Sequence, residues 1–227
     1  MTIKWQPISK ALHEIYKERN ILSHFENDEY YLKQAFDFTE NLWYEQFDKI
    51  ATLKTVLISE APLFGKKQTY IYNINARPSA FFHFNDLQAF STYHEIVKVP
   101  HSPVEKKQVM LKHFIKNGFL ILDIFPFALN PNITKINYRR VNQTLYNRLL
   151  QTTQESYLKP KLETCLQKSE NKTLFLYRYQ RLFELTENHF ENILNNVSSI
   201  KYTVDTINGT NMSLDRERLK RLLVENS

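Results

Sequence analysis

The chain has 227 residues of ordinary globular composition, 42% hydrophobic and 24% charged, and its formal net charge of +6 suggests that it binds a polyanion. No apolar run approaches eighteen residues and the N-terminus lacks an apolar core, so neither a transmembrane helix nor a signal peptide is expected. Cys165 is the single cysteine, which excludes an intramolecular disulfide and a cysteine-based zinc site and makes a reducing cytoplasm the simplest compartment.

Residues 8–24 and 28–51 are predicted to form two amphipathic helices, because their apolar side chains recur at helical spacing. This part of the chain is acidic, with seven Lys/Arg against ten Asp/Glu through residue 60, so the remainder carries an excess of about nine positive charges. We expect residues 1–52 to be a helical elaboration that packs against a sheet, with its aromatic side chains in the core.

The stretch Thr55–Asn73 is predicted to organise the rest of the chain. Thr55–Ser59 is an apolar, β-branched run typical of a buried strand, and Glu60-Ala-Pro62 follows it directly. Pro62 forces an extended exit from the strand, which leaves polar groups of the next loop free to face a ligand. Ligands of open α/β sheets bind beyond the carboxyl ends of strands. The alternative is an ordinary connection between a strand and a helix.

The remainder alternates predicted helices and strands. Asp123 follows the second apolar run, with a proline nearby, as Glu60 follows the first. The alternation predicts a single α/β domain over residues 1–227, a three-layer α/β/α sandwich around a central, mostly parallel four-stranded sheet. Helices are expected at 79–97, 104–117, 138–151, 156–168, 181–195 and 213–224, and strands at 119–122, 173–177 and 200–204.

Several common motifs are missing. The chain contains no GxGxxG, Walker P-loop, GxSxG or HExxH sequence, and its seven histidines are scattered without the spacing of metal ligands. A nucleotide-dependent or metal-dependent enzyme is therefore disfavoured, and neither a metal nor a cofactor is expected.

The order of these motifs resembles the uracil-DNA glycosylase superfamily. Ser59-Glu-Ala-Pro62 is similar to the Gly-Glu-Ala-Pro-Gly motif of some branches, and a tyrosine-rich segment, a second strand ending in an acid and a late strand-loop-helix unit follow in the same order. The correspondence covers roughly residues 50–225. The resemblance implies a monofunctional DNA glycosylase, a monomer by default, that excises a flipped base in DNA repair or in defence against phage DNA.

The resemblance also implies roles for individual residues. Glu60, Ala61 and Pro62 would cradle the base and the attacking water, with Glu60 as a catalytic group. Tyr70 or Tyr72 would stack on the base. Contacts to DNA would come from the loops and from nearby basic residues, namely Lys66, Lys67, Arg139, Arg140, Gly209, Thr210, Asn211 and Met212.

Three positions depart from the family pattern. Ala61 stands where the most active branch has a water-orienting aspartate, so activation would fall to Glu60 or to backbone carbonyls. The late loop lacks a histidine, so Asn208 or Thr210 would donate to the leaving base, and slow chemistry is expected because such donors are worth ~3 kcal/mol each. Asp123 stands where uracil-reading members have an asparagine.

Asp123 predicts the base preference. An ionised aspartate only accepts hydrogen bonds, so it would repel O4 of uracil and bind the N4 amino group of cytosine, which favours a modified cytosine-type base. Alternatively, Asp123 caps a helix or pairs with an arginine. Two other functions stay open: an inactive superfamily member that binds nucleic acid, and an unrelated α/β hydrolase or transferase that uses Glu60 and Asp123 as paired carboxylates on a small nucleoside or sugar.

Overall fold

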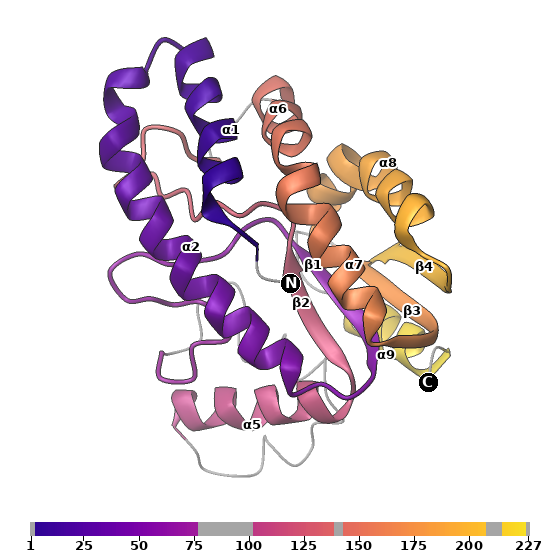
Figure 1. Cartoon of the computed structure of the whole chain (residues 1–227). Coiled ribbons are helices and arrows are strands. Elements are labelled where there is room, and N and C mark those ends of the chain that lie inside the picture. The colour runs from indigo at the N-terminus through magenta and orange to yellow at the C-terminus, as the bar shows by residue number, and fades with distance from the viewer. Residues whose placement is uncertain (1–2, 77–101, 139–142, 208–214, 226–227) are drawn as a thin grey trace.

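The computed structural model describes residues 3–76, 102–138, 143–207 and 215–225. Within these ranges four parallel strands form one sheet in the order β2-β1-β3-β4 (Figure 1). The strands are β1 (Leu53–Ser59), β2 (Phe119–Asp123), β3 (Ser169–Tyr177) and β4 (Lys201–Thr206). Helices lie on both sides of the sheet, so the prediction of a three-layer α/β/α sandwich around a parallel sheet is confirmed.

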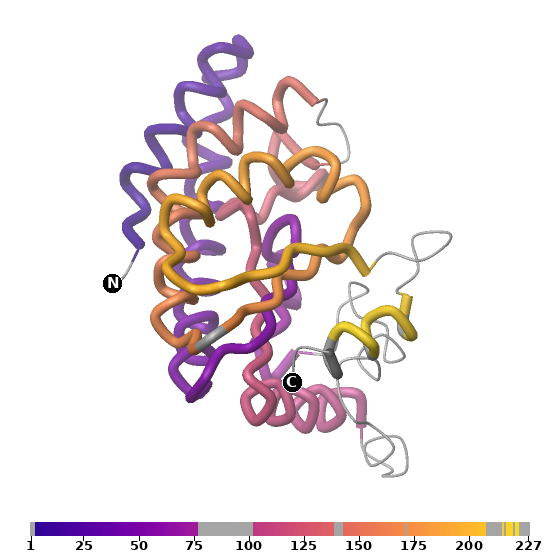
Figure 2. Tube along the Cα trace, turned by 90° about the vertical axis from the view of Figure 1, so that its right-hand side faces the viewer, coloured from indigo at the N-terminus to yellow at the C-terminus, as the bar shows by residue number. Residues whose placement is uncertain are grey.

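The helices follow the alternation expected from the sequence. They are α1 (Trp5–Glu18), α2 (Phe25–Asp48), α5 (Pro103–Lys116), α6 (Gln143–Thr153), α7 (Lys159–Gln167), α8 (Gln180–Val197) and α9 (Arg216–Glu225). The chain steps from β1 to β2 in one direction and then back past β1 to β3, so right-handed connections place α5 and α7 on opposite faces. Figure 1 shows α7 in front of the strands and α9 behind them. Figure 2 shows α8 and α9 on opposite sides of the strands.

β1 is one of the two inner strands of the sheet. Val56, Leu57 and Ile58 are fully buried, and Ile58 pairs with Leu122 of β2 on one side and Tyr177 of β3 on the other. A continuous apolar run is what a strand covered on both faces requires.

Two helix boundaries have clear local causes. The first predicted helix ends at Glu18 instead of residue 24, because Asn20 adopts a left-handed conformation (φ 55°) before a short 3₁₀ turn at Leu22–His24. α5 begins with a capping box, in which the Ser102 hydroxyl accepts from the Glu105 N–H and the Glu105 carboxylate accepts from the Ser102 N–H. α5 ends before Gly118, whose φ is +64°.

The helices predicted at 138–151 and 156–168 form one bent rod. A π-helical turn, η3 (Gln154–Leu158), joins α6 directly to α7. Pro160 lies in the first turn of α7, and a proline clashes with the carbonyl four residues before it in a regular helix. The wider π turn relieves this clash without ending the helix. The helix predicted at 79–97 lies outside the described residues.

Side chains cover the free edge of β2. Both the N–H and the C=O of Ile121 point away from β1 towards this edge. Trp43 Nε1 of α2 donates to the Ile121 carbonyl (2.9 Å), while the Tyr72 hydroxyl accepts from the Ile121 N–H (2.6 Å) and donates to its carbonyl (3.4 Å). These three contacts satisfy an edge that would otherwise offer unpaired groups to another chain.

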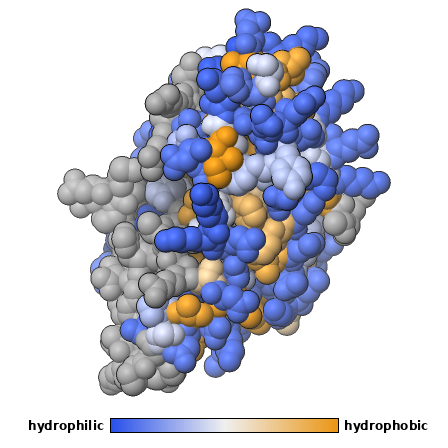
Figure 3. Space-filling view, turned by 90° about the vertical axis from the view of Figure 1, so that its left-hand side faces the viewer, coloured by the Kyte–Doolittle hydropathy of each residue, from blue (hydrophilic) through white to orange (hydrophobic). Residues whose placement is uncertain are grey.

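The side of the molecule that carries α1 and α2 is mainly hydrophilic. Figure 3 shows scattered apolar side chains on this side, separated by polar ones. None of the helices in the described ranges is long and apolar enough to cross a membrane.

Candidate functional site

The carboxyl edge of the sheet brings together polar residues from three strands. The chain leaves β1 towards β2 on one side and returns to β3 on the other, so the strand order reverses between β1 and β3. Such a reversal opens a crevice in which open α/β sheets bind their ligands. Glu60 follows β1, Asp123 ends β2 and Arg178 follows β3, and the Arg178 N–H bonds to the carbonyl of Ile58 (3.1 Å).

Glu60 is half-buried at this reversal point. Burial raises the pKa of its carboxyl group, and this shift is opposed by the positive charge of Arg181 and by the nearby hydroxyl of Tyr146. The Tyr146 side chain is only 1% exposed and packs edge-on against Phe125, with ring centroids 4.8 Å apart. Its hydroxyl is directed towards the Glu60 carboxyl group, in a contact too loose to count as a well-formed hydrogen bond, and has no other hydrogen-bond partner among the described residues. Buried hydroxyls normally have a partner, and the carboxyl group of Glu60 is the polar group that this one faces.

Asp123 lies deeper than Glu60, with 5% of its surface exposed. The Tyr70 hydroxyl donates to its Oδ2 atom (3.3 Å), and burial raises the pKa of its carboxyl group to about 7, although Ser59 and Tyr70 both favour the charged form. Burial therefore favours the protonated form of Asp123 near neutral pH, in which the carboxyl group can donate as well as accept. Its contacts within the described residues are with Tyr70 and Ser59, not with an arginine or a helix end.

Tyr70 and Tyr72 point inward. Tyr70 is 4% exposed with its hydroxyl on Asp123, and its ring meets that of Tyr72 edge-on at 5.6 Å. Tyr72 is buried with its hydroxyl on the main chain of Ile121. These contacts give Tyr72 a structural role at the edge of the sheet, and in this arrangement neither ring is open to a base.

A buried ion pair borders the Asp123 side of the site. Lys161 Nζ of α7 lies 2.8 Å from the Glu40 carboxylate of α2 and 3.4 Å from the centre of the Trp43 ring. Both side chains are almost completely buried. The positive charge of Lys161 lowers the pKa of Asp123, and the negative charge of Glu40 raises it. The pair therefore influences the pKa of Asp123, the carboxyl group predicted from the sequence to bind the base.

The remaining predicted residues divide into two sets. Lys66 and Lys67 are exposed in a turn that begins at Gly65 (φ +61°), on the loop that leaves the site, whereas Ala61 is half-buried and Pro62 buried. The other predicted residues lie outside the described part of the chain; these are Arg139, Arg140, Asn208, Gly209, Thr210, Asn211 and Met212.

Sequence reasoning missed four side chains of the site: Tyr146, Arg181, Glu40 and Lys161. The last two carried a usable signal. Lys161 lies three residues after Leu158 and four before Cys165, on the buried stripe of its helix, where a charged residue needs a partner. Tyr146 and Arg181 carried no such signal, because their approach to Glu60 depends on the tertiary fold.

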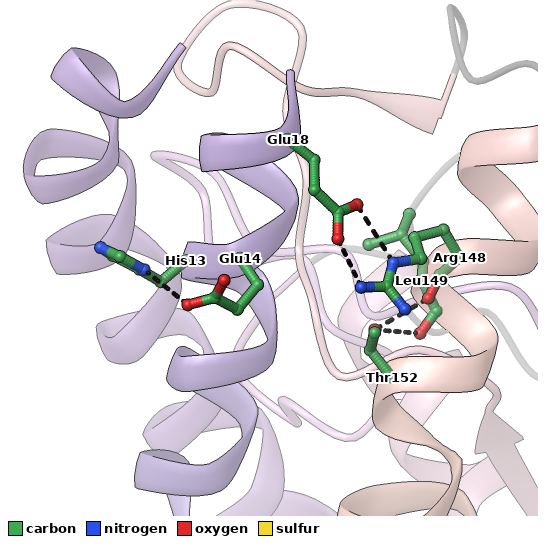
Figure 4. Close-up of polar contacts among 6 residues, drawn as sticks. All are labelled: His13, Glu14, Glu18, Arg148, Leu149 and Thr152. Carbon is green, nitrogen blue, oxygen red and sulfur yellow. Dashed lines mark hydrogen bonds and ion pairs between the residues drawn. The ribbon is translucent and has the colours of Figure 1, made fainter. Parts of the chain in front are cut away.

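A shallow hollow of about 440 Å³ lies between α1 and α6, away from the strand ends. Arg148 spans it, donating through Nε (3.1 Å) and Nη2 (2.5 Å) to the two carboxylate oxygens of Glu18, as Figure 4 shows. This ion pair is exposed and the hollow is lined by polar residues, so it lacks the enclosed apolar wall of a typical ligand pocket.

The described ranges contain no group of three or more His, Cys, Asp or Glu residues placed to hold a metal ion. Comparisons of the chain with protein-family models, curated proteins and solved structures gave no match.

Proposed function

We propose that the chain is a monofunctional DNA glycosylase, which hydrolyses the N-glycosidic bond of a flipped base of modified cytosine or uracil type. The observation that carries this proposal is the position of Glu60. It is a half-buried carboxyl group of raised pKa where the strand order reverses, next to the positive charge of Arg181 and the buried hydroxyl of Tyr146, both of which favour its charged form. The resemblance of Ser59-Glu-Ala-Pro62 to the first motif of the uracil-DNA glycosylase superfamily supports the same reaction.

Glu60 has the properties of a general base for this reaction. Water adds to C1′ of the deoxyribose while the glycosidic bond breaks, and the bonding electron pair leaves with the base as an anion, which then takes up a proton. The Glu60 carboxylate accepts the proton of the attacking water. A pKa raised towards neutrality improves such transfer, because a base is most effective when its pKa is near the working pH.

Asp123 is the proposed reader of the base. Its ionised form accepts from the N4 amino group of cytosine. Its protonated form presents one donor and one acceptor, which also fits the O4 and N3–H groups of uracil. Because the pKa of Asp123 is about 7, we expect selectivity for cytosine-type bases to increase as the pH rises above 7.

The test is an abasic-site assay on labelled oligonucleotides, single- and double-stranded, that carry uracil, cytosine, or methylated, hydroxymethylated or glucosylated cytosine. We expect Glu60→Gln to lower the rate at least 100-fold, since a positioned base contributes about 10²–10⁴. Glu45→Gln, on the exposed face of α2, is the matched control and should cleave like the wild type. Asp123→Asn should shift the preferred substrate towards uracil. An unchanged base preference would show that Asp123 does not select the base.

DNA binding supplies the second readout. Lys66 and Lys67 are exposed on the loop beside the site, so Lys66→Ala with Lys67→Ala should weaken binding and reduce its salt dependence. Salt-sensitive binding without any abasic product would favour a nucleic-acid-binding protein that lacks catalysis. Absence of both binding and product would overturn the proposal.

A further inference from the structure

A lysine of α5 binds the main chain of the segment that carries Tyr70, which is also held by Gln108 through the Ile74 carbonyl and by Tyr72 through the main chain of Ile121. Lys107 is 0% exposed, and its Nζ atom donates to the main-chain carbonyls of Tyr70 (3.0 Å), Asn73 (2.7 Å) and Ala76 (3.3 Å). An ammonium group has three donors, so all of them are used on this segment. We call residues Tyr70–Ala76 the Tyr70 strap.

Two different parts of the fold hold the strap. α5 holds its main chain through Lys107, and β2 holds its side chain, because the Tyr70 hydroxyl donates to Asp123 (3.3 Å). Between these points the strap consists of turns, with hydrogen bonds from the Asn73 N–H to the Tyr70 carbonyl and from the Ala76 N–H to the Asn73 carbonyl. No described part of the strap belongs to a strand or helix, so side-chain contacts largely determine its position.

The Tyr70 side chain itself has the chemistry of the proposed ligand. It is a planar aromatic ring that presents one hydrogen-bond donor to Asp123, as the N4 edge of a cytosine-type base would. Tyr70 and a base that donates to Asp123 Oδ2 would compete for the same carboxylate oxygen. Burial of Tyr70 and of Asp123 shows that the position is filled by the protein's own side chain.

We propose that Tyr70 is an internal occupant of the Asp123 base site, and that Lys107 is the positioning residue that sets how often Tyr70 leaves it. The proposal deepens the proposed function and rests on it. A base then binds only the fraction of molecules in which the strap has moved, so its apparent dissociation constant equals the intrinsic one divided by that fraction. Loosening the strap should therefore tighten base binding, whereas damage to an ordinary structural contact would weaken it.

The first experiment measures the strap without any nucleic acid. Tyrosine nitration by tetranitromethane, followed by peptide mass spectrometry, reports access to the Tyr70 ring. We expect slow nitration of Tyr70 in the wild type and at least about tenfold faster nitration in Lys107→Met, because three buried carbonyls lose their common donor. Lys112→Met, on the exposed face of α5, is the control and should leave the Tyr70 rate unchanged. Equal rates in the wild type and Lys107→Met would overturn the role of Lys107.

The second experiment measures binding of a single-stranded oligonucleotide with one 2′-fluoro-2′-deoxycytidine, whose glycosidic bond resists hydrolysis. Tyr70→Phe keeps the ring but removes the hydrogen bond to Asp123, so we expect about tenfold tighter binding, with a similar gain in Lys107→Met. If Lys107→Met does not fold, the binding constant of Tyr70→Phe alone tests whether Tyr70 occupies the base site. Unchanged or weaker binding by Tyr70→Phe would overturn the proposal while Glu60-dependent excision could still stand. Failure of the proposed function itself would instead abolish binding in every variant.

Discussion

Replacing Asp123 by asparagine should stabilise the protein at pH 8 and have little effect on stability near pH 4. Burial raises the pKa of Asp123 in the folded chain from 3.8 to about 7. Between these two values the folded state holds a proton that the unfolded state has lost, so stability falls as the pH rises through this window and levels off above pH 7. Asparagine is neutral throughout, and its amide oxygen can still accept from Tyr70.

The magnitude follows from the size of the pKa shift. A difference of about 3 pKa units corresponds to about 4 kcal/mol between the two protonation states, as an upper bound for the gain from Asp123→Asn above pH 7. Over the accessible range, from pH 5 to pH 8, the advantage of the variant should increase by roughly 3 kcal/mol. Lys161 and Glu40 remain in both proteins, so their own titration largely cancels in the difference.

Urea unfolding at pH 5, 6, 7 and 8, followed by circular dichroism, measures this difference directly. Asp37→Asn provides the matched control, because Asp37 is exposed and forms only a surface ion pair with Lys33. Its effect should stay below about 1 kcal/mol at every pH. If Asp123→Asn raises the free energy of unfolding equally at every pH, or lowers it at pH 8, ionisation of the buried Asp123 does not destabilise the folded state.

Two further predictions concern stability and use the same unfolding assay. Gly118→Ala should cost more than about 2 kcal/mol, because φ is +64° and a Cβ atom would come within 2.2 Å of a main-chain oxygen. Gly65→Ala has a similar φ, but its Cβ atom would make only an ordinary contact with Asn130 (3.5 Å), so it should cost about 1 kcal/mol. Lys161→Met should cost about 3–5 kcal/mol by leaving Glu40 buried without its partner, and adding Glu40→Leu should recover most of this loss. Lys159→Met, in an exposed pair, should cost under about 1 kcal/mol, and equal effects at both lysines would contradict the prediction.

Local patterns were sufficient to predict the layers of the fold. Apolar runs at residues 55–59 and 119–122 lie inside β1 and β2, and Gly118 separates α5 from β2 as a residue with positive φ should. Both signals depend on a few neighbouring residues, so they can be recognised in the sequence without knowledge of the tertiary structure. Boundaries were less accurate where a single residue decided them, as Asn20 does after α1 and Pro160 does in the rod of α6 and α7.

The candidate site was only partly predictable. Glu60 and Asp123 could be found because each lies at the carboxyl end of an apolar strand, and the carboxyl ends of parallel strands share one edge. The orientation of Tyr70 could not be found, because it depends on Lys107, 37 residues away along the chain. Lys107 looks like a surface residue of α5 in the sequence, and only the carbonyls of a distant segment make its burial possible.

The inner position of β1 in the sheet has a consequence for how the protein is made. Its partners in β3 end more than a hundred residues later in the chain, so at a synthesis rate of about 5–20 residues per second the ribosome needs on the order of 5–20 seconds to produce them. During that interval the apolar run Val56–Ile58 lacks its neighbouring strand on the β3 side. Nascent or truncated chains that end before β3 should therefore associate with chaperones and aggregate. Only after residues 169–177 have left the ribosome can β1 pair with a strand on both of its sides.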